Sequence, residues 1–254
     1  MIKFFREIRQ KKLTENKFGK YLTYAVGELI LVVFGILIAL SINNWNETRK
    51  NKIAEADYYC RILDDFEITE KLVNESLEEI NNRIGISKKI IADLNKTPNN
   101  KSEILNDFLN ALSQNVFVPS NIAFEDLTTS GNLKLITDIQ IKNKLIEYNT
   151  FLENTLELLQ ENRNERNKRM LNYELATEFG MQEFVHLKKE LGKEIVQLFP
   201  SNDWTNKKKD KTFLLFQDNL VFLVAMYTRQ KQYLSNLKKK MEEPIKLLKN
   251  KKCK

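Results

Sequence analysis

The first feature of the hydrophobic pattern is one long apolar stretch near the N-terminus. Residues 29–42 are apolar except for Gly35 and Ser41. As a helix they would measure about 21 Å, and adding residues 25–28 extends it to about 27 Å, close to a bilayer core of roughly 30 Å. The stretch is longer than the core of a signal peptide, and no small-residue cleavage site follows it. We therefore expect an uncleaved transmembrane helix over 21–46, with interfacial aromatic anchors at Tyr21, Tyr24 and Trp45.

A glutamate lies about one turn inside this expected span. At 100° per residue, Glu28 shares one stripe with two small residues and an outer asparagine. Small residues permit close approach of helices, and a carboxyl in a membrane needs a partner. The stripe thus predicts a contact with a sister helix or a partner helix, although a hydrated Glu28 near Lys20 or a lipid head group is the open alternative. Its members are Glu28, Val32, Gly35, Ala39, Ile42 and Asn46.

Basic residues favour an orientation for the span. Residues 1–20 hold seven Lys and Arg, whereas residues 46–65 hold four. Lys and Arg next to a span stay on the cytoplasmic side. We therefore expect an inner-membrane protein with a cytoplasmic N-terminus, a basic flank that contacts membrane lipid, and a body in the periplasm.

The rest of the chain repeats apolar residues every three or four positions, which is a helical period. One stripe runs through 52–96. A second helix follows the loop 97–103, where Asn100 and Glu103 form a cap. A short helix over about 121–129 ends at Ser130 and Gly131, and Asp138 caps a further helix whose continuation, 160–170, is polar enough to be solvated on most sides. A last apolar helix begins near Phe213.

These elements predict an all-α protein, with an N-terminal transmembrane helix followed by a bundle of long helices that has four or five main members. The scarcity of Gly and Pro, 7 and 4 residues, agrees with few and long helices. We divide the chain into a basic amphipathic flank (1–20), a transmembrane helix (21–46), an extracytoplasmic bundle (47–237) and a lysine-rich tail (238–254).

Charge and cysteine content exclude several classes of function. The net charge of +7 is concentrated in the two ends of the chain, so the body between them is mildly acidic. This distribution is not that of a nucleic-acid-binding face. Cys60 and Cys253 lie far apart and form no CxxC pair, so they indicate neither a zinc site nor a disulfide framework.

Motifs for catalysis, cofactors or metals are missing from the sequence. It contains no phosphate-binding loop, dinucleotide-binding turn, zinc-protease helix or nucleophile elbow. The only histidine, His186, follows Glu183 at the Glu-x-x-His spacing of di-iron bundles, but no second such motif exists. We therefore expect no catalytic residues, no cofactor, no metal and no enzyme activity.

One short polar stretch has two interpretations. The side chains of Thr128, Thr129 and Ser130, with the Gly131 amide, could form a small pocket for a ligand or an anion. The alternative, which we favour, is a capped helix end and a tight turn.

Two stretches resemble a known family: residues 4–47, which end in NNWNE, and residues 124–151, which begin FEDLTTSGNLKLI. They resemble a bacterial family of single-span, membrane-anchored proteins of unknown function, chiefly from Bacteroidota such as flavobacteria. The resemblance covers Gly27, Glu28, Gly35 and 43–47 in the first stretch. In the second stretch it covers Leu127, Ser130, Gly131, Leu133 and Ile136. It implies one span and a helical domain, and no mechanism.

The sequence thus favours a membrane-anchored interaction or sensory module of the cell envelope. It is compatible with oligomerisation through the span, and it leaves the small-molecule ligand open. A structural scaffold subunit of an envelope complex is the main alternative, and an enzyme with an unrecognised carboxylate site is the weaker one.

Overall fold

The structure is a computed structural model that describes residues 18–113, 115–170, 176–199 and 202–251, with side chains from Tyr21 onward. All regular elements within these residues are helical, as the sequence predicted. Their order is α2 (Phe18–Leu94), α3 (Lys101–Leu112), α4 (Ile122–Thr129), η1 (Asn132–Leu135), α5 (Ile139–Met170), α6 (Ala176–Phe179), η2 (Met181–Glu183), α7 (Val185–Val196), η3 (Trp204–Asn206) and α8 (Lys211–Lys249). The α and η labels denote α-helices and 3-10 helices.

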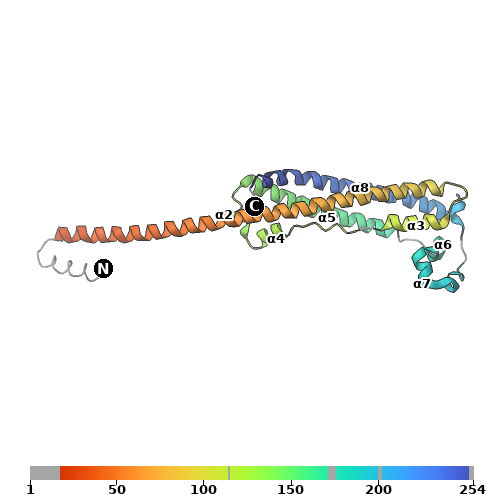
Figure 1. Ribbon diagram of the computed structural model, residues 1–254, viewed down its shortest axis with the longest axis horizontal. Helices are drawn as coiled ribbons and strands as arrows, with labels where there is room; N and C mark the ends of the chain where they lie inside the picture. The colour runs from red at the N-terminus through yellow and green to blue at the C-terminus, as the bar shows by residue number, and fades with distance from the viewer. Residues whose placement is uncertain (1–17, 114, 171–175, 200–201, 252–254) are drawn as a thin grey trace. The chain divides into compact units, whose positions relative to one another are not determined.

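The chain divides into two compact units, residues 1–56 and 57–254, and the division falls inside α2. In the first unit, α2 is continuous through Asn43, Asn44 and Asn46. The basic flank, residues 1–17, lies outside the described residues. The second unit is a bundle in which α5 and α8 run alongside the C-terminal half of α2 (Figure 1).

Burial along the three long helices follows alternating steps of three and four residues. On α8 the series includes Phe213, Phe216, Leu220, Leu223, Tyr227, Gln230, Leu234, Leu237, Met241, Pro244 and Leu248, and Asn219 and Met226 beside it are buried too. On α2 the series includes Tyr59, Ile62, Phe66, Thr69, Val73, Ile80, Arg83, Ser87, Ile90 and Leu94. This spacing keeps one face of α8, and of α2 from Tyr59 to Leu94, turned toward neighbouring helices. The helical stripes of the sequence therefore do form the core.

Local signals place the ends of several helices where the sequence predicted them. The Asn100 side chain accepts a hydrogen bond from the Glu103 amide at 3.3 Å, and Asp138 Oδ1 accepts one from the Ile141 amide at 3.1 Å. After α4, Gly131 takes a left-handed φ of 71°, which only glycine adopts without strain. Asp210 caps α8 by accepting from the Thr212 amide at 2.8 Å.

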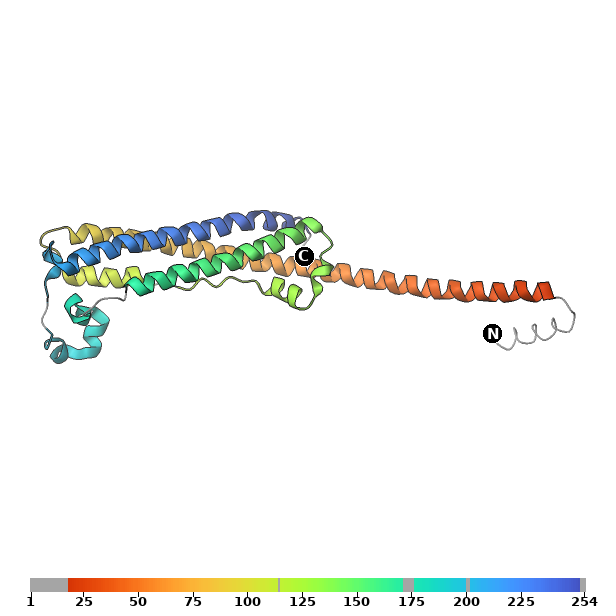
Figure 2. The ribbon, with the colours of Figure 1, turned by 180° about the vertical axis from the view of Figure 1, so that it is seen from behind.

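An aromatic cluster closes the end of the bundle where α2 leads into α3, the end that lies at the left in Figure 2. Trp204 is fully buried, stacks on Phe179 at a centroid distance of 5.5 Å, and meets Phe216 edge-on at 5.1 Å. Its indole N–H donates to the Phe179 carbonyl oxygen at 2.8 Å. Phe108 and Phe184 complete the cluster. This cluster ties the irregular segment that contains α6 and η2 to the bundle.

The polar stretch 160–170 is exposed on most sides, as expected, and Asn162, Arg166 and Met170 on the inner face of α5 are buried. Two other expectations from the sequence differ from the structure. The lysine-rich stretch that begins at residue 238 is no separate tail up to Lys249, because it continues α8 and buries Met241 and Leu248. The lysines occupy the outer face, which is why composition alone concealed the helix.

The second difference concerns cysteine. Cys60 is disulfide-bonded, so the conclusion that the cysteines indicate no disulfide was wrong. Sequence separation concealed it, because a bridge depends on distance in space and not along the chain. The chain's only other cysteine, Cys253, lies outside the described residues.

Candidate functional site

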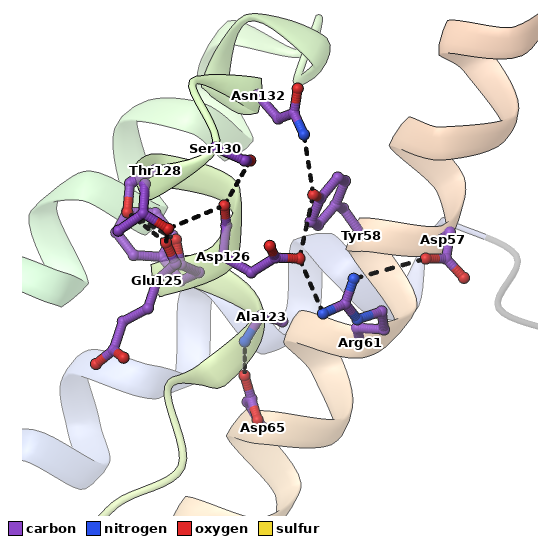
Figure 3. Close-up of polar contacts among 12 residues, drawn as sticks. Asp57, Tyr58, Arg61, Asp65, Ala123, Glu125, Asp126, Thr128, Ser130 and Asn132 are labelled. Carbon is purple, nitrogen blue, oxygen red and sulfur yellow. Dashed lines mark hydrogen bonds and ion pairs between the residues drawn. The ribbon is translucent and has the colours of Figure 1, made fainter.

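The polar turn after α4 lies against the N-terminal end of the bundle portion of α2 (Figure 3). Asp126 on α4 accepts hydrogen bonds from the Tyr58 hydroxyl at 3.2 Å and from Arg61 Nη2 at 3.1 Å. Asn132 Nδ2 in turn donates to the Tyr58 oxygen at 3.2 Å. Asp57, one turn earlier on α2, is 3.9 Å from Arg61. The network thus attaches α4 and η1 to α2, and Asp126 is a residue that the sequence reasoning missed.

The four residues proposed as a pocket lie at the end of α4 and have short-range partners. The Thr128 and Thr129 hydroxyls donate to the Glu125 carbonyl oxygen at 3.0 and 2.7 Å. The Ser130 hydroxyl donates to the Asp126 carbonyl at 2.6 Å, and the Gly131 amide donates to the Thr128 carbonyl at 3.1 Å. This is the geometry of the turn alternative, since the hydroxyls satisfy the last carbonyls of a helix. The pocket stays a prediction.

Asp65 on α2 bonds both the end of the connection between α3 and α4 and the start of α4. Asp65 Oδ1 accepts from the Ser120 hydroxyl at 2.5 Å, and Oδ2 accepts from the Ala123 amide at 2.7 Å. Beside them a cavity of about 10 Å³ reaches Tyr148, whose hydroxyl is buried without a hydrogen-bond partner. Burial, together with the negative charge of Asp65, raises the pKa of the Tyr148 phenol. The cavity is close in size to one water molecule, so we assign it a structural role.

A buried polar layer interrupts the apolar core midway along the bundle. Arg166 Nη1 donates to the Tyr227 oxygen at 3.2 Å and to the Leu112 carbonyl at 3.4 Å. Tyr227 donates to the Ala111 carbonyl, and Asn162 Nδ2 donates to the Met226 carbonyl at 3.2 Å. These bonds join α3, α5 and α8 at one level. A guanidinium held among neutral acceptors makes this level of the core electropositive.

Acidic residues gather at one place on α2 and α3. Carboxylate oxygens of Asp93, Glu103 and Asp107 lie within 4.8 Å of one another, and no other such group of three is found in the described part of the chain. Lys89 Nζ occupies the centre, at 2.6 Å from Asp107, 2.9 Å from Glu103 and 3.1 Å from Asp93. Hydrogen bonds to these carboxylates raise the pKa of Lys89. The ammonium therefore supplies the positive charge that a metal ion would bring.

The Glu-x-x-His pair is not arranged as a metal site. Glu183 forms a partly buried ion pair with Lys101, with Nζ 2.9 Å from Oε1. Lys101 Nζ also donates to the Asn202 carbonyl oxygen at 2.7 Å. His186 is exposed on α7. Glu183 thus serves to attach η2 to α3.

The expected transmembrane contact lies in the first unit. Glu28, Val32, Gly35, Ala39, Ile42 and Asn46 all lie on α2 with exposed side chains. A Cβ atom placed on Gly35 would meet nothing within 4 Å, so this part of the stripe is open to an approaching helix. Of the three expected anchors, Tyr24 and Trp45 are exposed and Tyr21 is partly buried. The helical periodicity of the sequence defines this face of α2, and contact of a second helix with it stays a prediction.

One helix in the described part of the chain is long and apolar enough to cross a membrane. Its best 18-residue window has a mean hydropathy of 2.6, and 0% of that window is buried. A signal sequence near an N-terminus can meet the same criteria of length and composition. The exposure of the whole window, which a soluble core helix would not show, favours an apolar surrounding.

Comparison with known proteins finds a match to one family model and indicates no activity. The model of DUF6090, a family of unknown function, matches residues 28–75, which begin at Glu28 and extend into the bundle portion of α2. No curated protein and no solved structure matches the chain. The match overlaps the first stretch in which the sequence resembled a family at residues 28–47, and it does not reach the second stretch at 124–151.

Proposed function

We propose that this chain is a single-pass protein of the inner membrane, and that its helical body is an interaction or sensory module outside the cytoplasm. The observation that carries the proposal is the uncovered apolar surface of α2. Leu31 is 73% exposed and Leu29 66%, whereas the large apolar residues of the bundle stripes are nearly all buried. Water penalises such a surface by about 25 cal/mol per Å², and the hydrocarbon of a bilayer removes that penalty.

Two observations support an extracytoplasmic body. The excess of Lys and Arg before the span favours a cytoplasmic N-terminus. The disulfide at Cys60 belongs to the body and not to the flank. Disulfides persist in oxidising compartments such as the bacterial periplasm and are rare in the cytosol. The bond therefore favours the orientation that the basic residues favour.

We further propose that the stripe from Glu28 to Asn46 contacts another transmembrane helix, from a second copy or from a partner. Gly35 and Ala39 would allow the backbones to approach, and Glu28 would hydrogen-bond across the interface. The experiment is disulfide crosslinking of Val32→Cys in native membranes, compared with Val33→Cys on another face. Selective crosslinking at position 32, lost in Glu28→Ala, supports the contact; equal crosslinking at both positions contradicts it.

The role of interaction or sensing rests on the architecture of the body. Its conspicuous polar contacts, at Asp126, Arg166 and Lys101, all join helices of the bundle to one another. We assign no reaction to this body. The resemblance to single-span proteins of Bacteroidota supports the same architecture.

Two measurements separate sensing from a scaffold. Saturable binding of a small molecule to the purified full chain would support sensing. Co-purification of one stoichiometric envelope protein after crosslinking in cells would support the scaffold. Turnover that disappears on replacement of one carboxylate, such as Asp65→Asn, would contradict both and restore the enzyme alternative.

A further inference from the structure

A cavity of about 160 Å³ opens in the side of the bundle. Its walls come from three segments: residues 115–117 of the connection between α3 and α4, one face of α5, and Gln230 of α8. All three belong to the unit 57–254, so the cavity is independent of the membrane segment. It is the larger of the two cavities described in this unit.

The wall has an apolar part and a polar part. Val116, Phe117, Leu156 and Leu159 form the apolar part, and Phe117, Leu156 and Leu159 pack against the hydrophobic core. Arg163 follows one turn after Leu159 on α5, so both reach the same side of the helix. Apolar walls with a few converging polar groups are typical of small-molecule sites.

Arg163 provides the charge of the polar part. Its side chain is partly buried, and its Nη2 donates to the amide oxygen of Gln160. A neutral amide does not compensate a guanidinium, which prefers a carboxylate that accepts two parallel hydrogen bonds. The residues that line the cavity thus include no carboxylate to pair with the partly buried Arg163.

The charged groups around the cavity do not change this conclusion. Glu79 on α2 accepts from Asn115 Nδ2 at 2.8 Å, but its second oxygen is paired with Arg83 at 3.3 Å. Arg229 on α8 is paired with Glu165 at 3.3 Å. Arg166, one turn beyond Arg163 on α5, bonds the neutral acceptors of the polar layer. The side of α5 that carries Arg163 and Arg166 is therefore positive.

Volume limits what can enter. A cavity of about 150 Å³ in a protein core accommodates benzene. We propose that this cavity binds a small organic anion, with a ring-sized apolar group against Leu156 and Leu159 and a carboxylate paired with Arg163. The proposal stands on the cavity alone; it would give the sensory module its class of ligand, but it requires neither the span nor its orientation.

Benzoate is the probe that matches this volume and charge. We would titrate benzoate into the purified full chain in detergent and follow the Leu and Val methyl signals by NMR. A ligand of this size is expected to bind with a Kd on the order of millimolar. The methyls of Val116, Leu156 and Leu159 should shift saturably, while that of Val221, exposed on α8, should not.

Charge selectivity is tested with isosteric probes and matched variants. Benzyl alcohol and benzylammonium should bind at least about tenfold more weakly than benzoate, because a charge-assisted hydrogen bond contributes about 1.5–3 kcal/mol. Arg163→Gln should weaken benzoate binding about tenfold, and Arg163→Lys should recover part of the loss. Lys168→Gln removes an exposed charge from the same helix outside the cavity and should change nothing.

Three results would overturn the proposal: no methyl shifts with millimolar benzoate, shifts centred elsewhere, or equal affinity in native protein and in a folded Arg163→Gln variant. Circular dichroism establishes that each variant is folded. None of these results bears on membrane insertion or on the side that the body occupies, so failure of the binding site and failure of the proposed membrane module can be distinguished.

Discussion

The two halves of α2 have the same backbone conformation and opposite surfaces. In residues 57–94 the large apolar side chains alternate at three and four positions and are buried, as at Ile62, Phe66 and Val73. In residues 21–46 they surround the helix and are exposed, as at Leu31, Phe34 and Leu37. A narrow stripe requires neighbouring helices, whereas an apolar cylinder requires an apolar solvent. The two halves of this one helix therefore require different surroundings.

The largest expected effect comes from charge in the apolar cylinder. Phe34→Arg together with Leu37→Arg should abolish integration into membranes, since each arginine near the middle of a span costs about 2.5–3.5 kcal/mol. Leu214→Arg with Val221→Arg, on exposed positions of α8, is the matched control and should leave integration unchanged. Extraction of membranes with alkaline carbonate measures both. A doubly substituted span that resists extraction would contradict the account.

Removal of a buried ring should have the next largest effect, on the stability of the body. Phe216 is fully buried between Phe108, Phe179 and Trp204. Phe216→Ala should lower the free energy of unfolding by about 3–5 kcal/mol, through lost burial and the cavity left behind.

Trp204 fluorescence, in a Trp45→Phe background, reports this unfolding in denaturant. Phe34→Ala removes the same ring from an exposed position in the first unit and is the matched control. Equal losses in the two variants would mean that the two halves of α2 do not differ in the way described.

The polar layer should contribute less than the aromatic cluster. Tyr227 donates to the Ala111 carbonyl and accepts from Arg166. Tyr227→Phe should destabilise the body by about 1 kcal/mol, the usual net value of a hydrogen bond, and more if the buried Arg166 is left unsatisfied. Tyr233→Phe on the same helix, where the hydroxyl bonds a partly exposed Arg229, should cost less. Chemical denaturation compares the two, and a reversed order would contradict the layer's role.

Acid should produce the smallest effect, through carboxylates on the outside of the bundle. The Lys251 ammonium, together with the Ile141 amide, lowers the pKa of Asp138 below its usual 3.8. Lys240 and Lys144 likewise lower the pKa of Glu147. A lowered folded-state pKa contributes stability above the unfolded-state pKa, and this stability is lost as the pH falls through the folded value.

The melting temperature should therefore be nearly constant between pH 7 and 5 and fall below about pH 4. Asp138→Asn should melt slightly below native protein at pH 7 and converge with it in acid. A constant difference across the whole range would show that the Asp138 charge is not responsible.

Sequence reasoning recovered the features that depend on local pattern. The helical stripes, the caps at Asn100 and Asp138 and the left-handed Gly131 are each encoded within a few residues, and all are present. A window long and apolar enough to cross a membrane was likewise readable from length and composition.

What the sequence could not provide depends on which distant segments meet. Arg166 lies in one of the most polar stretches of the chain, yet it is 6% exposed because α3 and α8 supply its acceptors. Asp126 and the cavity at Arg163 likewise combine segments far apart in the chain. One signal was available: Asn162, Arg166 and Met170 continue the spacing of the apolar positions of α5, so periodicity indicates which side of this polar stretch is buried.

The side of the membrane that the body occupies tests the central claim most directly. We would introduce Lys208→Cys in the exposed turn before α8 and, as the matched control, Lys11→Cys in the basic flank. Both are treated with a membrane-impermeant maleimide in spheroplasts of a bacterial expression host, with the native chain as background. The account predicts labelling at position 208 in intact spheroplasts and at position 11 only after lysis. Labelling at position 11 with protection at 208 would place the body in the cytoplasm and contradict the account.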